Sequence, residues 1–259
     1  MSPLKEFALA HNIPVFQPKS IRKEPEIKDE LKKLKPDFFV TFAFGQILSQ
    51  DVLDIPKYET INLHASLLPK YRGANPIQRA IINGDTETGV CTMITELGLD
   101  CGDVCLKHVI PIPDTMNCED LFAEISSVSP ELLERTLTGL VDGVIKPVKQ
   151  CEDGVCMANK LTKEETVIDW AKTAREIHNL VRGIYKFPSA HFMYNGKLIK
   201  VMQTKVVEGA GKPGEFVEVT KEGVKVACGR DCVMLIKVKP EGKGEMPARD
   251  WYNGVKKQV

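Results

Sequence analysis

The stretch TINLHASLLPKYRGANPIQRAIINGDTETGVCTMITE, residues 60–96, carries the clearest indication of the fold class. Thr60–Leu63 is a short apolar segment of the kind found in buried strands, and Gly89–Glu96 is another. Between these two strands a helix is predicted over Pro76–Asn83, since proline is favoured in the first turn of a helix. Strands that alternate with helices predict a mostly parallel α/β sheet.

The alternation continues on both sides of this stretch. EIKDELKKLK, residues 26–35, predicts an amphipathic helix that ends at Pro36, and Asp37–Phe42 (DFFVTF) predicts a buried strand. Residues 118–142 hold two helical patterns separated by Pro130. These elements place a first domain at residues 1–145.

The character of the sequence changes after this domain. Residues 146–163 show little periodicity and are interpreted as a linker. A second domain, residues 164–259, begins with a predicted helix over Glu164–Arg182 and continues as short alternating strands. Asn195-Gly196 is a strong hairpin signal. Several short strands at this spacing predict a small antiparallel β-barrel.

The composition is that of a globular protein outside the membrane. The chain has 259 residues, 43% of them hydrophobic and 27% charged. We expect no membrane partner, since there is no apolar run of about 18 residues. The opening MSPLKEFALAHNIP does not have the pattern of a secretory signal, so the cytoplasm is the expected location. The eight cysteines form no C-x-x-C pair, so we expect reduced thiols and no metal.

A net charge of zero conceals an asymmetry. From residue 160 onward there are 19 Lys+Arg and 12 Asp+Glu, whereas the preceding residues hold 16 and 23. A basic C-terminal portion suggests a polyanionic partner for that half, although an ordinary solvated surface explains the charge equally well.

Asn62, His64 and Asp100 are the residues that suggest chemistry. Asn62 and His64 lie two positions apart on a predicted strand, so their side chains share a face. An amide can stabilise an oxyanion, an imidazole can move protons near neutral pH, and a carboxylate can orient the imidazole. This combination is what acyl transfer to an amine requires. Each residue taken alone is more often structural: His64 as a strand-end residue and Asp100 as a turn residue.

The stretch NLHASLLPKYRGANPIQRAI, residues 62–81, resembles the signature of methionyl-tRNA formyltransferases. The segments NGDTETG at 83–89 and GLDCGD at 98–103 continue the resemblance. KLTKEE at 160–165, IDW at 168–170 and PEGK at 240–243 extend it over nearly the whole chain.

The resemblance implies a fold, a reaction and a set of residues. The fold is a doubly wound, mostly parallel sheet of the formyltransferase type, here truncated, followed by an OB-like β-barrel. The reaction is transfer of a formyl group from 10-formyltetrahydrofolate to the α-amino group of initiator methionyl-tRNA, with no metal. The expected catalytic residues are Asn62, His64 and Asp100. The folate site is expected at Ser66, Leu67, Leu68, Pro69, Phe44 and Gly45. The expected tRNA contacts are Arg72, Lys160, Arg182, Lys197, Lys200, Lys225 and Lys243.

Some of these residues have plainer interpretations. Ser66–Pro69 can equally be a connector, and each lysine taken singly is more often a solvated surface residue. We expect a monomer.

The chain departs from the family in two places. It begins beyond the strand, glycine-containing turn, helix and second strand with which the family opens. Loss of a central strand exposes buried backbone groups that cost about 1–3 kcal/mol each, so we expect poor folding or poor activity. The segment Tyr185-Lys-Phe187-Pro188 replaces the family's Asn-Pro-Trp-Pro, and Phe187 is expected to keep the apolar packing.

Two other functions fit parts of the pattern. A folate-dependent formyltransferase acting on an amino sugar would share Asn62, His64 and Asp100, but the basic barrel and Pro76–Arg79 favour the tRNA enzyme. A non-catalytic RNA-binding remnant would keep only the barrel's affinity.

Overall fold

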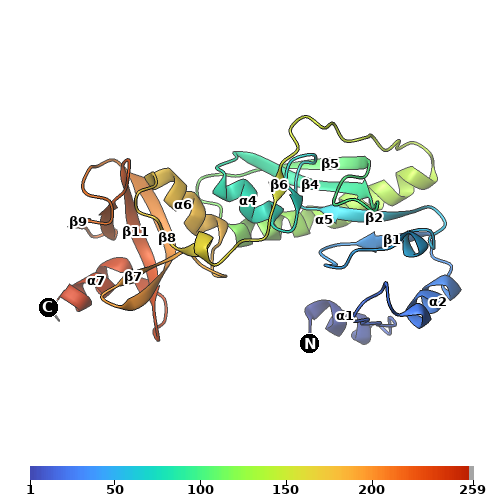
Figure 1. Ribbon diagram of the computed structural model, residues 1–259, viewed down its shortest axis with the longest axis horizontal. Helices are drawn as coiled ribbons and strands as arrows, with labels where there is room; N and C mark the ends of the chain where they lie inside the picture. The colour runs from blue at the N-terminus through green and yellow to red at the C-terminus, as the bar shows by residue number, and fades with distance from the viewer. Residues whose placement is uncertain (257–259) are drawn as a thin grey trace. The chain divides into compact units, whose positions relative to one another are not determined.

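The computed structural model describes residues 1–256, which Figure 1 traces from blue to red. The chain divides into two compact units. The first unit consists of Met1–His64, Thr92–Leu106 and Leu133–Gln150, and the second unit of Ala65–Cys91, Lys107–Leu132 and Cys151–Val259. Over residues 1–256, no helix combines the length and the apolar character needed to cross a bilayer.

The helices are α1 (Pro3–Ala10), α2 (Pro25–Lys33), α3 (Gln50–Leu53), α4 (Pro76–Ile82), α5 (Cys118–Val141), the 3-10 helix η1 (Glu164–Thr166), α6 (Ala174–Gly183) and α7 (Ala248–Lys256). The strands are β1 (Phe38–Thr41), β2 (Glu59–His64), β3 (Arg72–Gly73), β4 (Glu87–Ile94), β5 (Val104–Pro111), β6 (Met157–Ala158), β7 (His191–Tyr194), β8 (Lys197–Val207), β9 (Phe216–Val219), β10 (Val224–Ala227), β11 (Cys232–Pro240) and β12 (Met246–Pro247).

The sheet of the α/β domain is mixed, so the expectation of a mostly parallel sheet is wrong. Its strand order is β1-β2-β4-β5, and β1 pairs with β2 in parallel. In the first unit the N–H of Ile94 bonds to the carbonyl of Asp103, and in the second unit the N–H of Ile112 bonds to that of Thr86. These two hydrogen bonds show that β4 and β5 are antiparallel. The short loop between them permits a hairpin, whereas a parallel connection needs a crossover of a dozen or more residues.

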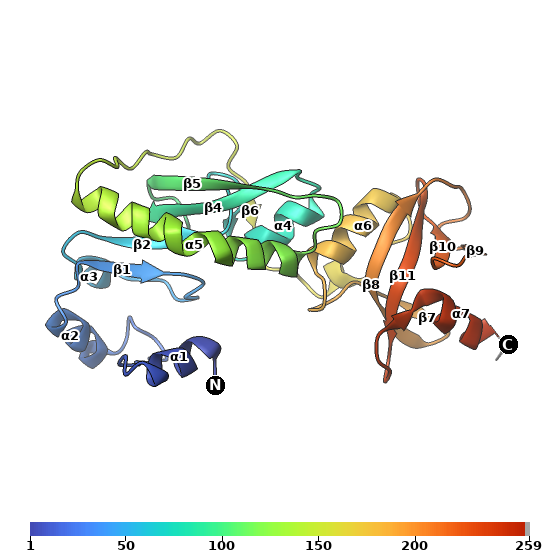
Figure 2. The same ribbon diagram turned by 180° about the vertical axis from the view of Figure 1, so that it is seen from behind.

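Helix α5 is continuous through Pro130, where the sequence predicted a break between two helices. Proline removes one backbone donor from a helix, but Pro130 lies on the exposed side. Leu121, Ile125 and Thr136 are fully buried on the opposite side, so tertiary packing holds the helix together. In the first unit the Thr136 and Thr92 hydroxyls hydrogen-bond at 2.7 Å, where the second half of α5 runs beside β4 (Figure 2).

The C-terminal part of the second unit is an antiparallel half-barrel. Its strand order is β7-β8-β11-β10-β9 (labelled in Figure 2), and β12 pairs with β11. Ile177 of α6, Val201 of β8 and Trp251 of α7 share one hydrophobic core. The Asn195-Gly196 hairpin is confirmed, because both residues have positive φ and Tyr194 pairs with Lys197 across the turn.

Two local expectations in this domain are wrong. The helix predicted over Glu164–Arg182 begins only at Ala174, because Thr173 and Glu176 form a reciprocal capping box that starts α6 there. Phe187 does not keep an apolar packing role, since its side chain is 85% exposed. It follows Lys186, whose φ of +59° lies in the left-handed region.

Candidate active site

Asn62 lies at the carboxyl end of β2 and is oriented by the neighbouring strand. Thr41 of β1 stands opposite Asn62 in the parallel register. Its hydroxyl donates a hydrogen bond of 2.9 Å to the Asn62 side-chain oxygen. Because the oxygen of the amide faces Thr41, the two N–H donors of Asn62 face the other way. They are the part of this side chain that can stabilise a developing negative charge.

His64 follows on the same face of β2 and is buried, with 5% of its surface exposed. Its Nδ1 lies 3.6 Å from Oδ2 of Asp100. This separation is longer than a hydrogen bond but within the range of an ion pair. Since Nδ1 faces the carboxylate, Nε2 at the other side of the ring is the nitrogen suited to exchange a proton with a reactant.

The loop that carries Asp100 is held by hydrogen bonds to its backbone carbonyls. Asp100 itself has a φ of +48°, which places it in the left-handed region. The Gln150 side-chain amide donates to the carbonyls of Asp100 and Gly102 at 2.9 and 2.8 Å. A side chain at Gly102 would meet the Ile94 carbonyl at 2.0 Å, so only glycine fits there. Gln150 could not be predicted from the sequence as a contact of this loop, because it lies 50 residues away from Asp100 along the chain.

The expected folate residues fall into accessible and buried groups. In the first unit, Phe44 and Gly45 are exposed in the loop after β1. In the second unit, Leu67 and Pro69 are half-buried. Ser66 and Leu68 have no exposed surface, and the Ser66 hydroxyl donates to the Lys70 carbonyl at 2.6 Å. The side chains of Ser66 and Leu68 therefore serve packing.

Tyr71 anchors the segment that carries Arg72. Tyr71 is buried with a φ of +62°, an unusual backbone conformation for an aromatic residue. Its hydroxyl donates to the Asp85 carboxylate at 3.0 Å and accepts from the Asn83 amide at 3.1 Å. Burial raises the pKa of Tyr71 to about 12, so the phenol stays protonated. Sequence reasoning missed this role, although Asn83 and Asp85 stand in the NGDTETG segment.

The expected tRNA contacts differ in exposure. Lys160, Lys197 and Lys243 are exposed, and Lys200 and Lys225 are half-buried. Arg72 is half-buried as well.

Arg182 is a correction to the expected tRNA contacts. It is 8% exposed, and its guanidinium donates to the carbonyls of Pro113 and Met116 and to the side chain of Asn179. The sequence placed Arg182 at the end of a predicted helix but could not show which way its side chain faces. This arginine has a structural role and is not on the surface to meet a phosphate.

A row of basic residues crosses three neighbouring strands of the half-barrel. Lys200 of β8 pairs with His191 of β7 on one side and with Lys239 of β11 on the other. Directly paired residues project on the same face of a sheet, and like charges opposite one another are destabilising. An anion would therefore be favourable beside Lys200 and Lys239. Sequence reasoning missed His191 and Lys239 because strand register was not known.

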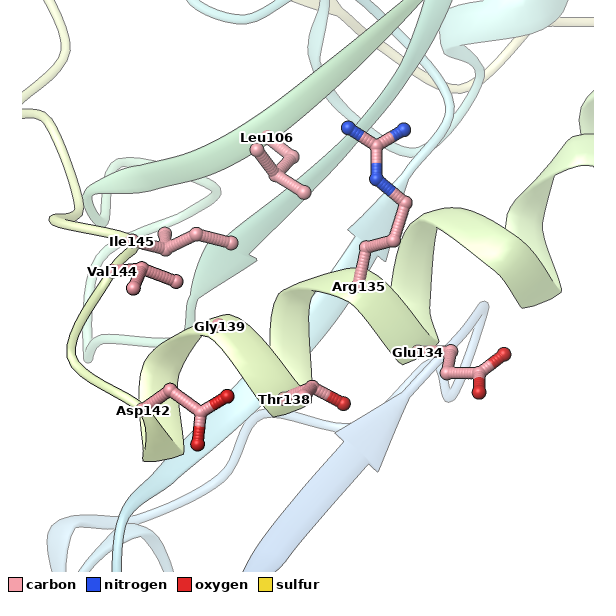
Figure 3. Close-up of a pocket in the computed structure, with 8 residues that line it drawn as sticks. All are labelled: Leu106, Glu134, Arg135, Thr138, Gly139, Asp142, Val144 and Ile145. Atoms are coloured by element: carbon pink, nitrogen blue, oxygen red, sulfur yellow. The ribbon is translucent and has the colours of Figure 1, made fainter.

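A separate hollow in the first unit contains none of the expected site residues. It has a volume of about 440 Å³ and lies between Leu106 of β5 and the end of α5, where Glu134, Arg135 and Asp142 project (Figure 3). Its other lining residues are Thr138, Gly139, Val144 and Ile145.

Comparison with known proteins defines the class of the chain. Residues 3–137 match the formyl transferase family, and residues 160–256 match the formyl transferase C-terminal domain. The two matches together make the chain a formyl transferase with both of its domains.

Closer relatives identify the family. The chain is 45% identical to a methionyl-tRNA formyltransferase of Clostridium perfringens and 48% identical to one of Clostridium botulinum. Each similarity covers 98% of this chain, and 83% and 82% of the respective relatives. The chain belongs to the methionyl-tRNA formyltransferase family.

A solved structure supports the fold. The chain is similar to an N-formyltransferase from Helicobacter canadensis, in complex with folinic acid and dTDP-3-aminofucose, with a TM-score of 0.68 and 21% identity. This similarity covers 90% of this chain and 82% of that one.

Proposed function

We propose that the chain transfers a formyl group from 10-formyltetrahydrofolate to the α-amino group of methionine esterified to initiator tRNA, for translation initiation. The observation that carries the proposal is the arrangement at the end of β2. There an amide oriented by Thr41 and an imidazole facing Asp100 share one strand face. This set of groups occurs in a chain of the methionyl-tRNA formyltransferase family.

The proposed reaction assigns one role to each side chain. The amino nitrogen attacks the formyl carbon, and the carbonyl oxygen becomes an oxyanion that accepts a hydrogen bond from the Asn62 amide. His64 takes a proton from the attacking nitrogen and returns one to N10 of the folate as the bond between N10 and the formyl carbon breaks. Asp100 holds the His64 ring in the orientation that turns Nε2 to the reactants.

The residues proposed to bind folate are Phe44 and Gly45 in the first unit and Leu67 and Pro69 in the second unit, with Ser66 and Leu68 contributing backbone groups only. Exposed Phe44 offers an aromatic ring for stacking on the pterin. Gly45 has a φ of +74° and no neighbour near the position of a Cβ, so its backbone can be approached closely.

The tRNA is proposed to be held by the C-terminal domain. In this assignment residues 1–145 form the catalytic domain, 146–163 the linker and 164–259 an OB-like tRNA-binding domain. Arg72, Lys160, Lys197, Lys200, Lys225 and Lys243 are the proposed contacts, to which we add His191 and Lys239. Lysine contacts to phosphates make binding strongly salt-dependent, and this dependence is the expected signature.

The experiment that tests the proposal compares acceptors. Formyl transfer from 10-formyltetrahydrofolate is measured with initiator methionyl-tRNA, with the same tRNA uncharged, and with a dTDP-linked amino sugar. We expect transfer to methionyl-tRNA alone, with a KM that rises with salt. Transfer to the amino sugar in preference to the tRNA would overturn the proposed substrate.

A further inference from the structure

Arg79 of α4 directs its whole guanidinium to the segment formed by residues 158–165. Nη1 and Nη2 contact the two carboxylate oxygens of Glu165 at 2.5 and 3.1 Å. Nε donates to the carbonyl of Asn159 at 3.1 Å, and Nη2 also approaches that of Lys160 at 3.5 Å. A two-pronged arginine–carboxylate contact fixes geometry as well as charge, which a lysine in the same place would not do.

A second side chain at the start of α4 holds the same segment. Oδ1 of Asn75 accepts from the N–H of Leu161 at 3.2 Å. The backbone N–H groups of Ala74 and Asn75 both donate to the carbonyl of Ala158. Gly73 allows this approach, since a Cβ there would lie 2.9 Å from the same carbonyl oxygen.

These contacts order a stretch that carries two exposed cations. Lys160 and Lys163 are exposed, whereas the Arg79 side chain is 16% exposed and its charge is matched by Glu165. A hollow of about 400 Å³ beside the contacts is lined in part by Arg79, Asn159 and Lys160. Arg79 is therefore poorly suited to bind a phosphate itself but well suited to place the residues that can.

We propose that Arg79 is a positioning residue for the tRNA, holding residues 158–165 so that Lys160 and Lys163 meet phosphates at a fixed spacing. The inference rests on the proposed function, in which tRNA is the substrate. Ordering a mobile segment and two long side chains opposes binding, so a segment ordered beforehand binds more tightly. Glu165 and Asn75 act with Arg79 in this role.

The test measures equilibrium binding of initiator methionyl-tRNA by the full chain over a range of salt concentrations. Arg79→Met removes the contacts and keeps the side-chain stem, and Glu165→Gln removes the charge of the partner with little change in shape. Lys28→Met is the matched control, because the Lys28 side chain is 14% exposed and pairs with Asp51 at 2.6 Å. Both residues belong to the first unit, whereas residues 158–165 belong to the second unit. The double variant Lys160→Ala/Lys163→Ala removes the cations that Arg79 is proposed to position.

We expect Arg79→Met to raise the Kd about tenfold, the scale for ordering a few long side chains, and to make the salt dependence shallower. Glu165→Gln should also raise the Kd and make the salt dependence shallower, but by less, and Lys28→Met should change neither the Kd nor the salt dependence. In the Lys160→Ala/Lys163→Ala background, Arg79→Met should have almost no further effect. A purely structural role would weaken binding by the same factor in both backgrounds.

Two results would overturn the inference alone: a Kd within twofold of wild type for both Arg79→Met and Glu165→Gln, or an Arg79→Met effect that is undiminished in the double variant. Wild-type protein that does not bind the tRNA at all would instead overturn the tRNA assignment of the proposed function, and the inference with it.

Discussion

Replacing Thr41 with valine tests whether the orientation of Asn62 matters for catalysis. Valine keeps the shape of threonine and suits a strand, so the change removes only the hydroxyl that donates to Asn62 at 2.9 Å. A neutral hydrogen bond contributes about 0.5–1.5 kcal/mol net. If that amount is lost from the transition state, kcat falls by a factor of about 2.3 to 13. Complete loss of an oxyanion donor, as in Asn62→Ala, should cost about 100- to 1000-fold.

The assay is single-turnover formyl transfer to methionyl-tRNA under saturating folate, with thermal unfolding measured alongside. Thr41→Ser keeps the hydroxyl and should transfer at close to the wild-type rate. Both Thr41 and Asn62 are half-buried, so the free energy of unfolding should change by less than about 1 kcal/mol. A kcat for Thr41→Val within a factor of two of wild type would refute the argument that Thr41 orients the amide.

Three further predictions concern the rest of the chain. Arg182→Met should lower the free energy of unfolding by about 2–3 kcal/mol, because the substitution leaves buried carbonyls without donors. A change in the salt dependence of tRNA binding by Arg182→Met would contradict the structural role of this arginine. Burial lowers the pKa of His178 below its ordinary 6.5, so the contribution of this residue to stability is complete above pH 6.5 and is lost as the pH falls. Between pH 7.5 and pH 5.5, the free energy of unfolding measured in urea should therefore fall less for His178→Gln than for wild type. An equal fall in the two proteins would contradict this role of His178. Burial raises the pKa of the Cys91 and Cys228 thiols to about 11. Iodoacetamide at pH 8 should therefore alkylate exposed Cys151 before these two cysteines. Alkylation of Cys91 as fast as that of Cys151 in the native protein would contradict this protection.

The sequence predicted elements better than it predicted their pairing. The apolar run at Asp37–Phe42 and the hairpin at Asn195-Gly196 depend on local chemistry, and strands and a turn are found there. Strand direction depends on contacts between distant residues, so the mixed sheet could not be seen from periodicity. Continuity of α5 through Pro130 has the same origin, since burial on one face outweighs a local helix breaker.

For the site, sequence reasoning was strongest where residues are close along the chain. Asn62 and His64 share a strand face as their spacing predicts, and Asp100 lies beside His64. The supporting residues were missed because they come from elsewhere: Thr41 from the adjacent strand and Gln150 from beyond α5. Arg182 shows the opposite error, in which a charged residue was taken to be on the surface although the helix turns it inward.

The role of His64 in formyl transfer is tested by the rate of transfer to initiator methionyl-tRNA by wild type and by His64→Ala, with folate and tRNA binding measured on both. We expect that wild type transfers the formyl group and that His64→Ala loses at least about 100-fold in kcat while both substrates still bind. Wild-type turnover by His64→Ala would rule out the proposed reaction, in which His64 alone moves the proton.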